Sequence, residues 1–379
     1  MKSVALVTEY NPFHNGHLYH AQKSKSITET EVSIAIMSGN FVMRGQPAIY
    51  NKFTRTRMAL HAVDLVVELP AFAALSAGQY FAETAVQVAD YLDVNHLSFG
   101  SESGDINAFL SLAQEMDKVE DSPQFIEKSK EGKSYPRIIS ELISNNILLS
   151  SPNNTLGISY VRAIQKCAPT IQPWTISREQ SAHHDESINN LNFASGTSIR
   201  KSIQSGDKQW QNVVPESAKD HYVLPHLSID ETFNYIKYAI LSSDAHTLKQ
   251  IHTMSEGLEH RLLHYISEAT SFEHLMTLIK TKRYTYTHIQ RLLMNTLLNF
   301  KQQDKPSKIN AVRILGMSQN GQKYLKHIKN KFPERHFITQ INKQNAHYFP
   351  SEIHATQMYN FLSTQTETDF NTPVIRMLS

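Results

Sequence analysis

The feature that most constrains the fold is an alternation of short apolar segments and amphipathic segments across the first two hundred residues. The short segments are rich in β-branched residues and stop at Gly, Ser, Pro or a charge, which is typical of strands. They span residues 3–7, 32–37, 65–69, 96–99 and 171–176. Between them, apolar residues recur at helical spacing in residues 16–26, 51–63, 77–92, 106–116, 136–145 and 154–165. This order predicts an α/β fold, a Rossmann-like parallel sheet with helices on both faces, whose ligands bind beyond the carboxyl ends of the strands.

The strand pattern fades after residue 208, and helical patterns follow. They cover residues 229–242, 245–255, 258–269, 272–280, 286–302 and 321–331. A chain of 379 residues is long enough for two domains. We therefore predict a catalytic domain over residues 1–205 and a mainly α-helical domain over residues 206–379.

Composition excludes several classes of protein. The single cysteine, Cys167, rules out an intrachain disulfide and a thiolate metal cluster. No apolar run approaches the roughly 18 residues that a membrane-spanning helix needs. We expect a soluble, cytoplasmic protein that does not act at a membrane.

The charge is unevenly distributed, although the whole chain carries only +2. Residues 278–343 hold fourteen Lys or Arg and two acidic residues, a local net charge of +12, with tyrosines between them. Such a stretch is typical of a surface for a phosphate backbone, and its alternative is a solvated helical face. The candidates for phosphate contacts are Lys280, Lys282, Arg283, Arg291, Lys323 and Lys326.

The most informative motif follows the first predicted strand. It is His14-x-Gly16-His17, preceded by Asn11 and Pro12. A glycine permits a tight turn into the helix, whose free N–H groups favour an anion. Two imidazoles at that turn can donate to phosphate oxygens as pyrophosphate leaves. The alternatives are an ordinary turn with capping histidines and a zinc site, although no H-E-x-x-H pattern is present.

A second motif opens a predicted helix late in the first half. It runs from Ser195 to Lys201 and reads Ser-Gly-Thr-Ser-Ile-Arg-Lys. Its hydroxyls can cap the helix while the N–H groups bind the β- and γ-phosphates. Arg200 or Lys201 can offset the charge of departing pyrophosphate. The alternative is a plain helix cap.

The two motifs together resemble the nucleotidyltransferase superfamily with an H-x-G-H signature, which includes adenylyltransferases and class I aminoacyl-tRNA synthetases. The second motif is similar to the Ile-Ser-Ser-Thr-x-Ile-Arg box of the adenylyltransferases. Glu9 and Asn11 stand where small-molecule adenylyltransferases usually have Thr and Asp. The second box reads Ala-Ser-Gly-Thr, beginning at Ala194.

Further segments narrow the resemblance. They read Met-Ser-Gly-Asn-Phe at 37–41, Arg-Gly-Gln-Pro-Ala at 44–48, Phe-Gly-Ser-Glu at 99–102 and Pro-Asn-Asn-Thr-Leu-Gly at 152–157. With the first motif they are similar to the family of bacterial tRNA(Met) cytidine acetate ligases over the first 205 residues. The resemblance implies that ATP activates acetate as acetyl-adenylate, with release of pyrophosphate. It further implies acetylation of the exocyclic amine of the wobble cytidine in elongator tRNA(Met), giving N(4)-acetylcytidine, with Mg²⁺ accompanying ATP.

The resemblance also implies site residues. His14 and His17 would be catalytic. ATP would lie along the loop formed by Val7, Thr8, Glu9, Tyr10, Asn11, Pro12, Phe13, His14, Asn15, Gly16, His17, Leu18, Tyr19 and His20, together with Gly100, Asn153, Arg178, Ser195, Thr197 and Ser198. The basic candidates above would bind tRNA. No Asp/Glu constellation marks a protein site for a metal.

Each outlying position has a structural alternative. Gly100 would let the nucleotide lie on the backbone after the fourth strand, or it forms a simple turn. Asn153 would bind ribose or base, or it caps a helix. Arg178 would grip phosphate or adenine, or it forms a surface salt bridge.

Other polar groups near these motifs have weaker assignments. Charged residues beside a loop usually face solvent. Four cations after the second strand are nevertheless candidates for neutralising acetate or steering the anticodon, namely Arg44, Lys52, Arg55 and Arg57. The His183-His184-Asp185 segment receives no role. Two other functions stay open: a small-molecule nucleotidyltransferase indifferent to RNA, and an ATP-sensing RNA-binding protein without turnover.

Overall fold

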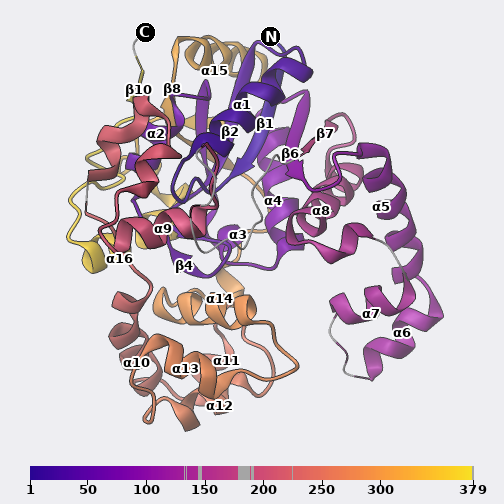
Figure 1. Ribbon diagram of the computed structural model, residues 1–379, viewed down its shortest axis with the longest axis vertical. Helices are drawn as coiled ribbons and strands as arrows, with labels where there is room; N and C mark the ends of the chain where they lie inside the picture. Colours follow the sequence, from indigo (N-terminus) through magenta and orange to yellow (C-terminus); the bar gives the residue numbers. More distant parts are fainter. Residues whose placement is uncertain are drawn as a thin grey trace.

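The protein is built on one sheet of eight strands, with a short hairpin beside it (Figure 1). The computed structural model describes residues 1–131, 133, 135–143, 147–177, 188, 192–223 and 225–377. The strand order is β10-β8-β5-β2-β1-β6-β7, and β9 pairs with β8. The strands are β1 Ser3–Thr8, β2 Val32–Ser38, β5 Leu65–Leu69, β6 His96–Ser101, β7 Gln172–Ser177, β8 Ala311–Met317, β9 His336–Ile338 and β10 Ile375–Arg376, and the hairpin is β3 Phe41–Val42 with β4 Gln46–Pro47.

The five strands predicted from sequence are confirmed as β1, β2, β5, β6 and β7, and their pairings with one another are all parallel. Alternate residues of β2 enter two different cores. Ile34 and Ile36 pack on one face of the sheet, whereas Ala35 and Met37 pack on the other. Both faces are therefore buried, which explains why these strands read as continuous apolar runs.

Helices cover both faces of the sheet (Figure 1). Helices α4, α5, α8 and α15 contribute to the core on one face, and α1, α2 and α9 to the core on the other. The six helices predicted between the strands are confirmed as α1, α2, α4, α5, α7 and α8. The helices of the first half are α1 Asn15–Ile27, α2 Lys52–Ala59, α3 Ala71–Ala74, α4 Gly78–Tyr91, α5 Ile106–Glu120, α6 Pro123–Lys130, α7 Tyr135–Leu142, α8 Pro152–Cys167 and α9 Gly196–Gln204.

The second half contains the predicted helices and one more. They are α10 Phe233–Leu241, α11 Ala245–Lys249, α12 Leu258–Tyr265, α13 Phe272–Ile279, α14 Tyr286–Leu297, α15 Gln319–Lys331 and α16 Pro350–Ser363, of which α16 was not predicted. Helices α10 to α14 form a lobe below the sheet (Figure 1). Its apolar core continues through Phe72 of α3 and Tyr359 of α16, so the lobe packs directly against the sheet domain.

Three strands after residue 208 were not predicted from the sequence: β8, β9 and β10 join the sheet within the mainly helical second half. Strand β8 runs antiparallel to β5. Its sequence hides it, because Arg313 and Gly316 interrupt the apolar run, yet Arg313 is only 1% exposed. The sheet thus takes strands from both sides of residue 205, and the division of the chain into two domains there stays a prediction. Among the described residues, no helix has the length and apolar character needed to span a membrane.

Candidate active site

Two imidazoles lie parallel at the start of α1, directly beyond the carboxyl end of β1. His14 caps the helix, and its Nδ1 accepts a hydrogen bond from the Gly16 amide at 3.1 Å. The His17 amide donates to the His14 carbonyl at 2.8 Å. The two rings stack with centroids 3.7 Å apart and planes 26° apart. Because Nδ1 of His14 is an acceptor, its neutral ring carries the proton on Nε2, where it serves as a donor.

Gly16 leaves room for the His14 ring. A Cβ atom at residue 16 would lie 3.0 Å from Cε1 of His14, closer than carbon atoms normally approach. A side chain here would push the His14 ring away from its amide partner. The glycine of the motif therefore serves the histidine beside it as well as the turn.

The rest of the predicted ATP loop divides between core and surface. Tyr10 and Phe13 are at most 1% exposed, so their side chains belong to the core and only their backbone can meet a ligand. Tyr10 has a left-handed backbone with φ of 47°, a conformation that costs energy for a non-glycine residue and is held by the structure around it. On the outer side of α1, a hollow of about 300 Å³ is lined by Asn15, Leu18, Tyr19, Gln22, Asn192 and Phe193.

The second motif meets the first. Ser195 caps α9 by accepting from the Ser198 amide at 3.1 Å, as a plain cap would. Arg200 then extends back to the first loop, donating to the Asn11 carbonyl at 2.7 Å and to Thr197 Oγ1 at 3.2 Å. Two motifs about 180 residues apart in sequence are therefore joined by one guanidinium.

Arg200 keeps its charge in this setting. Burial lowers the pKa of its guanidinium to about 10, the nearby Arg44 adds to the effect, and Glu9 opposes it. At neutral pH the group therefore stays protonated, beside the N-terminus of α9. Glu9 itself accepts from the Met43 amide at 2.7 Å, which fixes the β3–β4 hairpin to the same loop.

Two further predicted residues lie at the adjacent strand. Gly100 lies within β6, opposite Ile176 of β7, and does not follow the strand as expected. Asn153 is in the first turn of α8 and donates to Glu102 Oε1 at 2.6 Å. Its neighbour Asn154, which was not singled out, accepts from the Glu102 amide at 3.0 Å. Strand β6 pairs with β1, so these groups lie next to the histidine loop.

Some of the sequence assignments cannot be placed. Arg178 lies outside the described residues, and so do His183, His184 and Asp185. Strand β7, which precedes them, ends at Ser177. Their predicted roles, or lack of one, rest on sequence alone.

Arg55 of α2, a candidate for acetate or the anticodon in the sequence analysis, has instead a structural role that the sequence did not indicate. It is fully buried and donates to the carbonyls of Glu9 at 2.6 Å, Ser38 at 3.0 Å and Gly39. These carbonyls follow β1 and end β2, so one side chain ties two neighbouring strand ends together. Burial lowers the pKa of the guanidinium to about 10, which leaves it charged at neutral pH.

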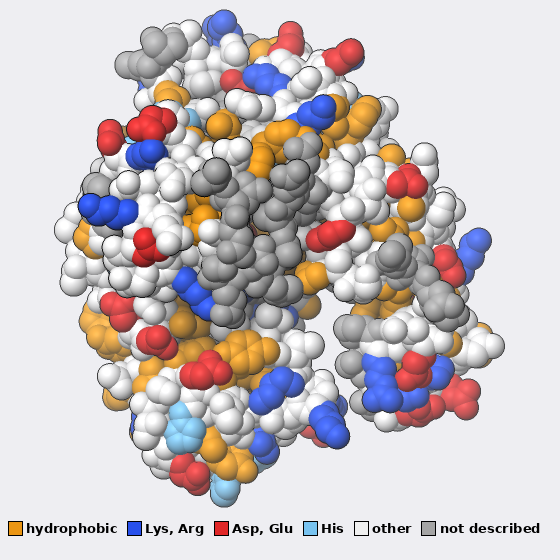
Figure 2. Space-filling model, viewed as in Figure 1, with side chains coloured by type: hydrophobic (Ala, Val, Ile, Leu, Met, Phe, Trp, Pro, Cys, Tyr) orange, Lys and Arg blue, Asp and Glu red, His pale blue; other side chains and the backbone are white. Residues whose placement is uncertain are grey.

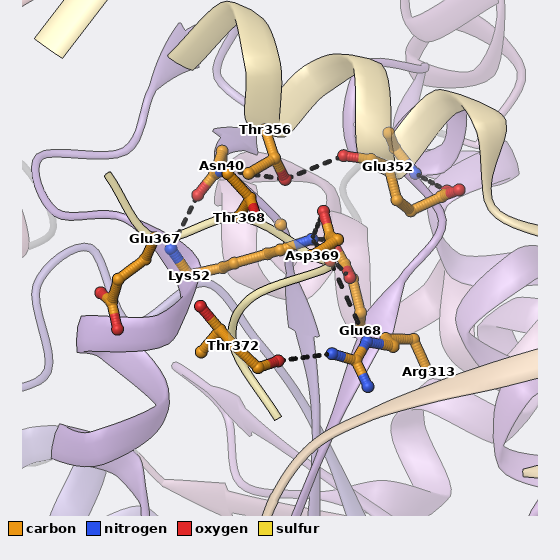
Figure 3. Close-up of polar contacts among 12 residues, drawn as sticks. Asn40, Lys52, Glu68, Arg313, Glu352, Thr356, Glu367, Thr368, Asp369 and Thr372 are labelled. Atoms are coloured by element: carbon orange, nitrogen blue, oxygen red, sulfur yellow. Dashed lines mark hydrogen bonds and ion pairs between the residues drawn. The ribbon is translucent and has the colours of Figure 1, made fainter. Parts of the chain in front are cut away.

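Lys52, on the same helix, fastens the C-terminal segment to the sheet (Figure 3). Its Nζ is fully buried and lies 2.8 Å from Glu68 Oε1 and 2.8 Å from Asp369 Oδ1. Arg313 donates to the Thr372 carbonyl at 3.2 Å in the same cluster. Burial raises the pKa of Glu68 to about 7, while the ammonium of Lys52 opposes this shift.

These contacts decide among the cations that follow the second strand. Lys52 and Arg55 are fully buried, and their polar groups bind other residues of the same chain. In this structure neither side chain is accessible to acetate or RNA. Arg57 pairs with Glu367 of the C-terminal segment. Arg44 remains half-buried beside Arg200.

The basic stretch of residues 278–343 separates into two surfaces, which lie beyond opposite ends of the parallel strands (Figure 1). Lys280, Lys282 and Arg283 are exposed on the turn between α13 and α14. Lys323 and Lys326 are exposed on α15. Helix α15 starts near the amino-terminal ends of the parallel strands. This position is shown by a hydrogen bond of 2.8 Å from the Ser318 amide to the carbonyl of Asp64, the residue before β5.

The α13–α14 turn lies instead on the side of the histidine loop. Arg291 of α14 donates to the Met43 carbonyl at 3.1 Å, and Met43 is bonded to Glu9 beyond β1. Arg291 is only 9% exposed, so its guanidinium holds the β3–β4 hairpin in place. The turn and the carboxyl ends of the strands therefore face the same region.

Magnesium is expected to accompany ATP, and it would need oxygen or nitrogen ligands from the protein if the chain held it directly. Within the described ranges, no group of three His, Cys, Asp or Glu side chains is arranged to hold a metal ion. The acidic Glu9 already accepts from an amide. The residues described thus offer no cage of their own for the ion.

Comparisons with known proteins identify the family of this chain. A family model described as HIGH Nucleotidyl Transferase matches residues 1–372. Proteins called tRNA(Met) cytidine acetate ligase are 73% identical in Staphylococcus saprophyticus, with both chains covered completely, and 58% identical in Staphylococcus aureus, with 99% of each chain covered.

Two crystal structures of Thermotoga maritima TmcAL share the fold. The apo form has a TM-score of 0.89 at 26% identity, and the form bound with alpha-thio ATP has a TM-score of 0.85 at 25% identity. Both matches cover the whole of both chains. The chain therefore belongs to the HIGH nucleotidyl transferases and, among them, to the family of tRNA(Met) cytidine acetate ligases.

Proposed function

We propose that this protein is an ATP-dependent acetate ligase that acetylates the wobble cytidine of elongator tRNA(Met). The observation that carries the proposal is the meeting of the stacked His14 and His17 with the N-terminus of α9 through Arg200. Helix N-termini and imidazole donors together suit a triphosphate. The names of the relatives and the alpha-thio ATP in the Thermotoga maritima structure support the same substrates.

In the first step, ATP lies along residues 7–20 and reaches Gly100, Asn153, Arg178 and the hydroxyls of Ser195, Thr197 and Ser198. Acetate is ionised at neutral pH and needs no general base. A carboxylate oxygen of acetate attacks the α-phosphorus, a new P–O bond forms, and the bond to pyrophosphate breaks. His14 and His17 stabilise the charge that builds on the phosphates. Positioning and electrostatics therefore supply the catalysis.

In the second step, the N4 amine of cytidine attacks the acetyl carbonyl carbon of acetyl-adenylate. The carbon–oxygen bond to AMP breaks, and the amine loses a proton to solvent. Residues 1–205 supply the ATP site, and residues 206–379 contribute the RNA-binding surface. Mg²⁺ accompanies ATP and reduces the charge of its phosphates. The enzyme acts in the cytoplasm, where its tRNA substrate is found.

Labelled acetate tests the proposal directly. Purified protein is incubated with ATP, ¹⁴C-acetate and elongator tRNA(Met), and the digested RNA is analysed by mass spectrometry for N(4)-acetylcytidine. Incorporation that requires ATP and this tRNA is the expected result. Exchange of pyrophosphate that depends on a phosphorylated metabolite, with no label in RNA, would identify a small-molecule adenylyltransferase. RNA binding with no turnover of ATP would identify a non-enzymatic protein.

A further inference from the structure

A large cavity lies between two parts of the molecule that are distant in sequence. It has a volume of about 1150 Å³, and one of its walls is formed by α4, α5 and α8 and the other by the α13–α14 turn. In Figure 2 the surface is hollowed between the lower lobe, which carries α13 and α14, and the lobe that carries α5 to α7. Pockets that enclose one small ligand are usually roughly 300–1,000 Å³, so this cavity suits something larger.

The cavity adjoins the candidate active site at two points. Arg291 lines the cavity and holds the β3–β4 hairpin, which is hydrogen-bonded to Glu9. Thr155 also lines it and lies on α8, two residues after the predicted ATP contact Asn153. A substrate held in the cavity would therefore lie beside the ends of β1 and β6.

The wall formed by the α13–α14 turn combines cations with flat rings. The Arg283 guanidinium lies 5.5 Å from the centre of the Tyr284 ring. The Tyr284 ring stacks on that of His288, with centroids 5.3 Å apart and planes 16° apart. Burial, with help from Arg291, lowers the pKa of His288 to about 4, so its ring is neutral at physiological pH. Lys282 is exposed on the same turn.

Three of the four carboxylates on the opposite wall have cationic partners, and the fourth, Asp121, is exposed. Arg162 pairs with Asp117 at 2.6 Å and with Glu120 at 2.7 Å. Lys166 lies 3.5 Å from Glu83. These pairs reduce the repulsion that the wall would exert on a phosphate, and they leave the exposed cations of the turn as the groups that attract one.

We propose that this cavity binds the unpaired nucleotides next to the target cytidine, with Lys282 and Arg283 contacting phosphates and the Tyr284–His288 pair stacking on a base. Proteins bind single-stranded RNA with this combination of positive charge and aromatic faces. Paired bases present no free face for stacking, so the turn selects a loop over a duplex. The assignment rests on the proposed function, and it places RNA at the α13–α14 turn and not at α15.

The test compares two turn variants, Arg283→Ala and Tyr284→Leu, with the control Lys329→Ala on α15. Leu keeps an apolar side chain where Tyr284 packs against the lobe core. Two rates are measured for each protein: acetate-dependent exchange of pyrophosphate into ATP, which takes place without RNA, and acetylation of the tRNA(Met) anticodon stem-loop. Stacking and phosphate contacts of this kind predict a loss of about tenfold in kcat/KM for RNA, taken relative to the exchange rate.

The outcomes separate this inference from the proposed function. A tenfold fall in the RNA-to-exchange ratio for both turn variants, with Lys329→Ala equal to wild type, supports the cavity as the RNA site. An unchanged ratio in the turn variants, while wild-type protein acetylates the stem-loop, overturns the cavity assignment alone. A wild-type protein that exchanges pyrophosphate but never labels RNA overturns both. A blunt-ended RNA duplex without unpaired nucleotides that competes as well as the stem-loop also overturns the assignment.

Discussion

Two groups of cations in this protein have opposite fates. On α2, Lys52 and Arg55 are fully buried and bind carboxylates and carbonyls of the protein itself. On the α13–α14 turn, Lys282 and Arg283 are exposed beside aromatic rings. The residue types are the same, and the difference lies in what packs around them. The comparison teaches that a run of Lys and Arg indicates a binding surface only where these side chains are not already bound to buried acceptors of the same chain.

The largest expected effect is on the stability provided by α2. Replacing Lys52 by Met leaves Glu68 and Asp369 buried without their shared cation. Breaking a buried ion pair in this way costs about 3–5 kcal/mol of unfolding free energy. Urea denaturation of Lys52→Met and of the control Lys329→Ala measures the difference. Equal stabilities for the two variants would show that the α2 cations are no more structural than surface ones.

The exposed turn should respond to salt and not to denaturant. Each phosphate contact with a single strand contributes about −0.7 to the slope of log K against log salt concentration. Losing two contacts in the double variant Lys282→Ala/Arg283→Ala should make that slope shallower by about 1.4, while the urea midpoint stays near that of wild type. Filter binding of the stem-loop from 50 to 300 mM salt gives the slope. A slope equal to that of wild type contradicts contact between the turn and phosphate.

Stability should also depend on pH through Glu68. Its pKa is about 7 in the folded protein, against an ordinary value of 4.5. A carboxyl whose pKa is raised by folding stabilises the protein below its unfolded pKa, and this contribution is lost as pH rises to about 7. Wild type should therefore lose stability relative to Glu68→Gln between pH 5 and pH 7.5. Thermal or urea unfolding across this range measures the difference, and a gain by wild type would reverse the assignment.

The smallest effect is expected at the edge of the buried cluster. Arg57 lies on α2 with Lys52 and pairs with Glu367, but both side chains are about a third exposed. Such pairs contribute about 0.2–1 kcal/mol to stability. Arg57→Ala should therefore cost far less than Lys52→Met in the same urea titration. If Arg57→Ala lost as much unfolding free energy as Lys52→Met, the Arg57–Glu367 pair would have to be as important for stability as the buried cluster.

Much of this fold could be predicted because the signals for its strands and helices lie in residues that are close together in the sequence. The parallel strands and their helices follow from spacing of a few residues, and both nucleotide motifs could be found as short strings. What failed depends on distant partners. Arg313 reads as a surface charge until Thr372 and Asp369 are known to lie beside it. Strand β8 and the burial of Lys52 are invisible for the same reason, since Asp369 lies 317 residues away along the chain.

The candidate site shows the same division. His14, Gly16 and Ser195 were predicted from their own sequence context, and the structure brings their two motifs together through Arg200. The structural role of Arg55 was missed, because its partners are backbone carbonyls, which carry no side-chain signal. The split of the basic stretch between the α13–α14 turn and α15 also needed the sheet topology.

The most direct test of the account is acetate-dependent pyrophosphate exchange by His14→Ala beside wild type. Loss of one positioned donor to a developing charge typically lowers the rate about 10²–10³-fold. The account predicts such a loss in a variant that stays folded and loses only the roughly 0.5–2 kcal/mol of unfolding free energy that a helix cap contributes. Exchange at the wild-type rate would mean that the stacked imidazoles at the start of α1 do not bind the triphosphate, and the proposed chemistry would have to be sought elsewhere on the protein.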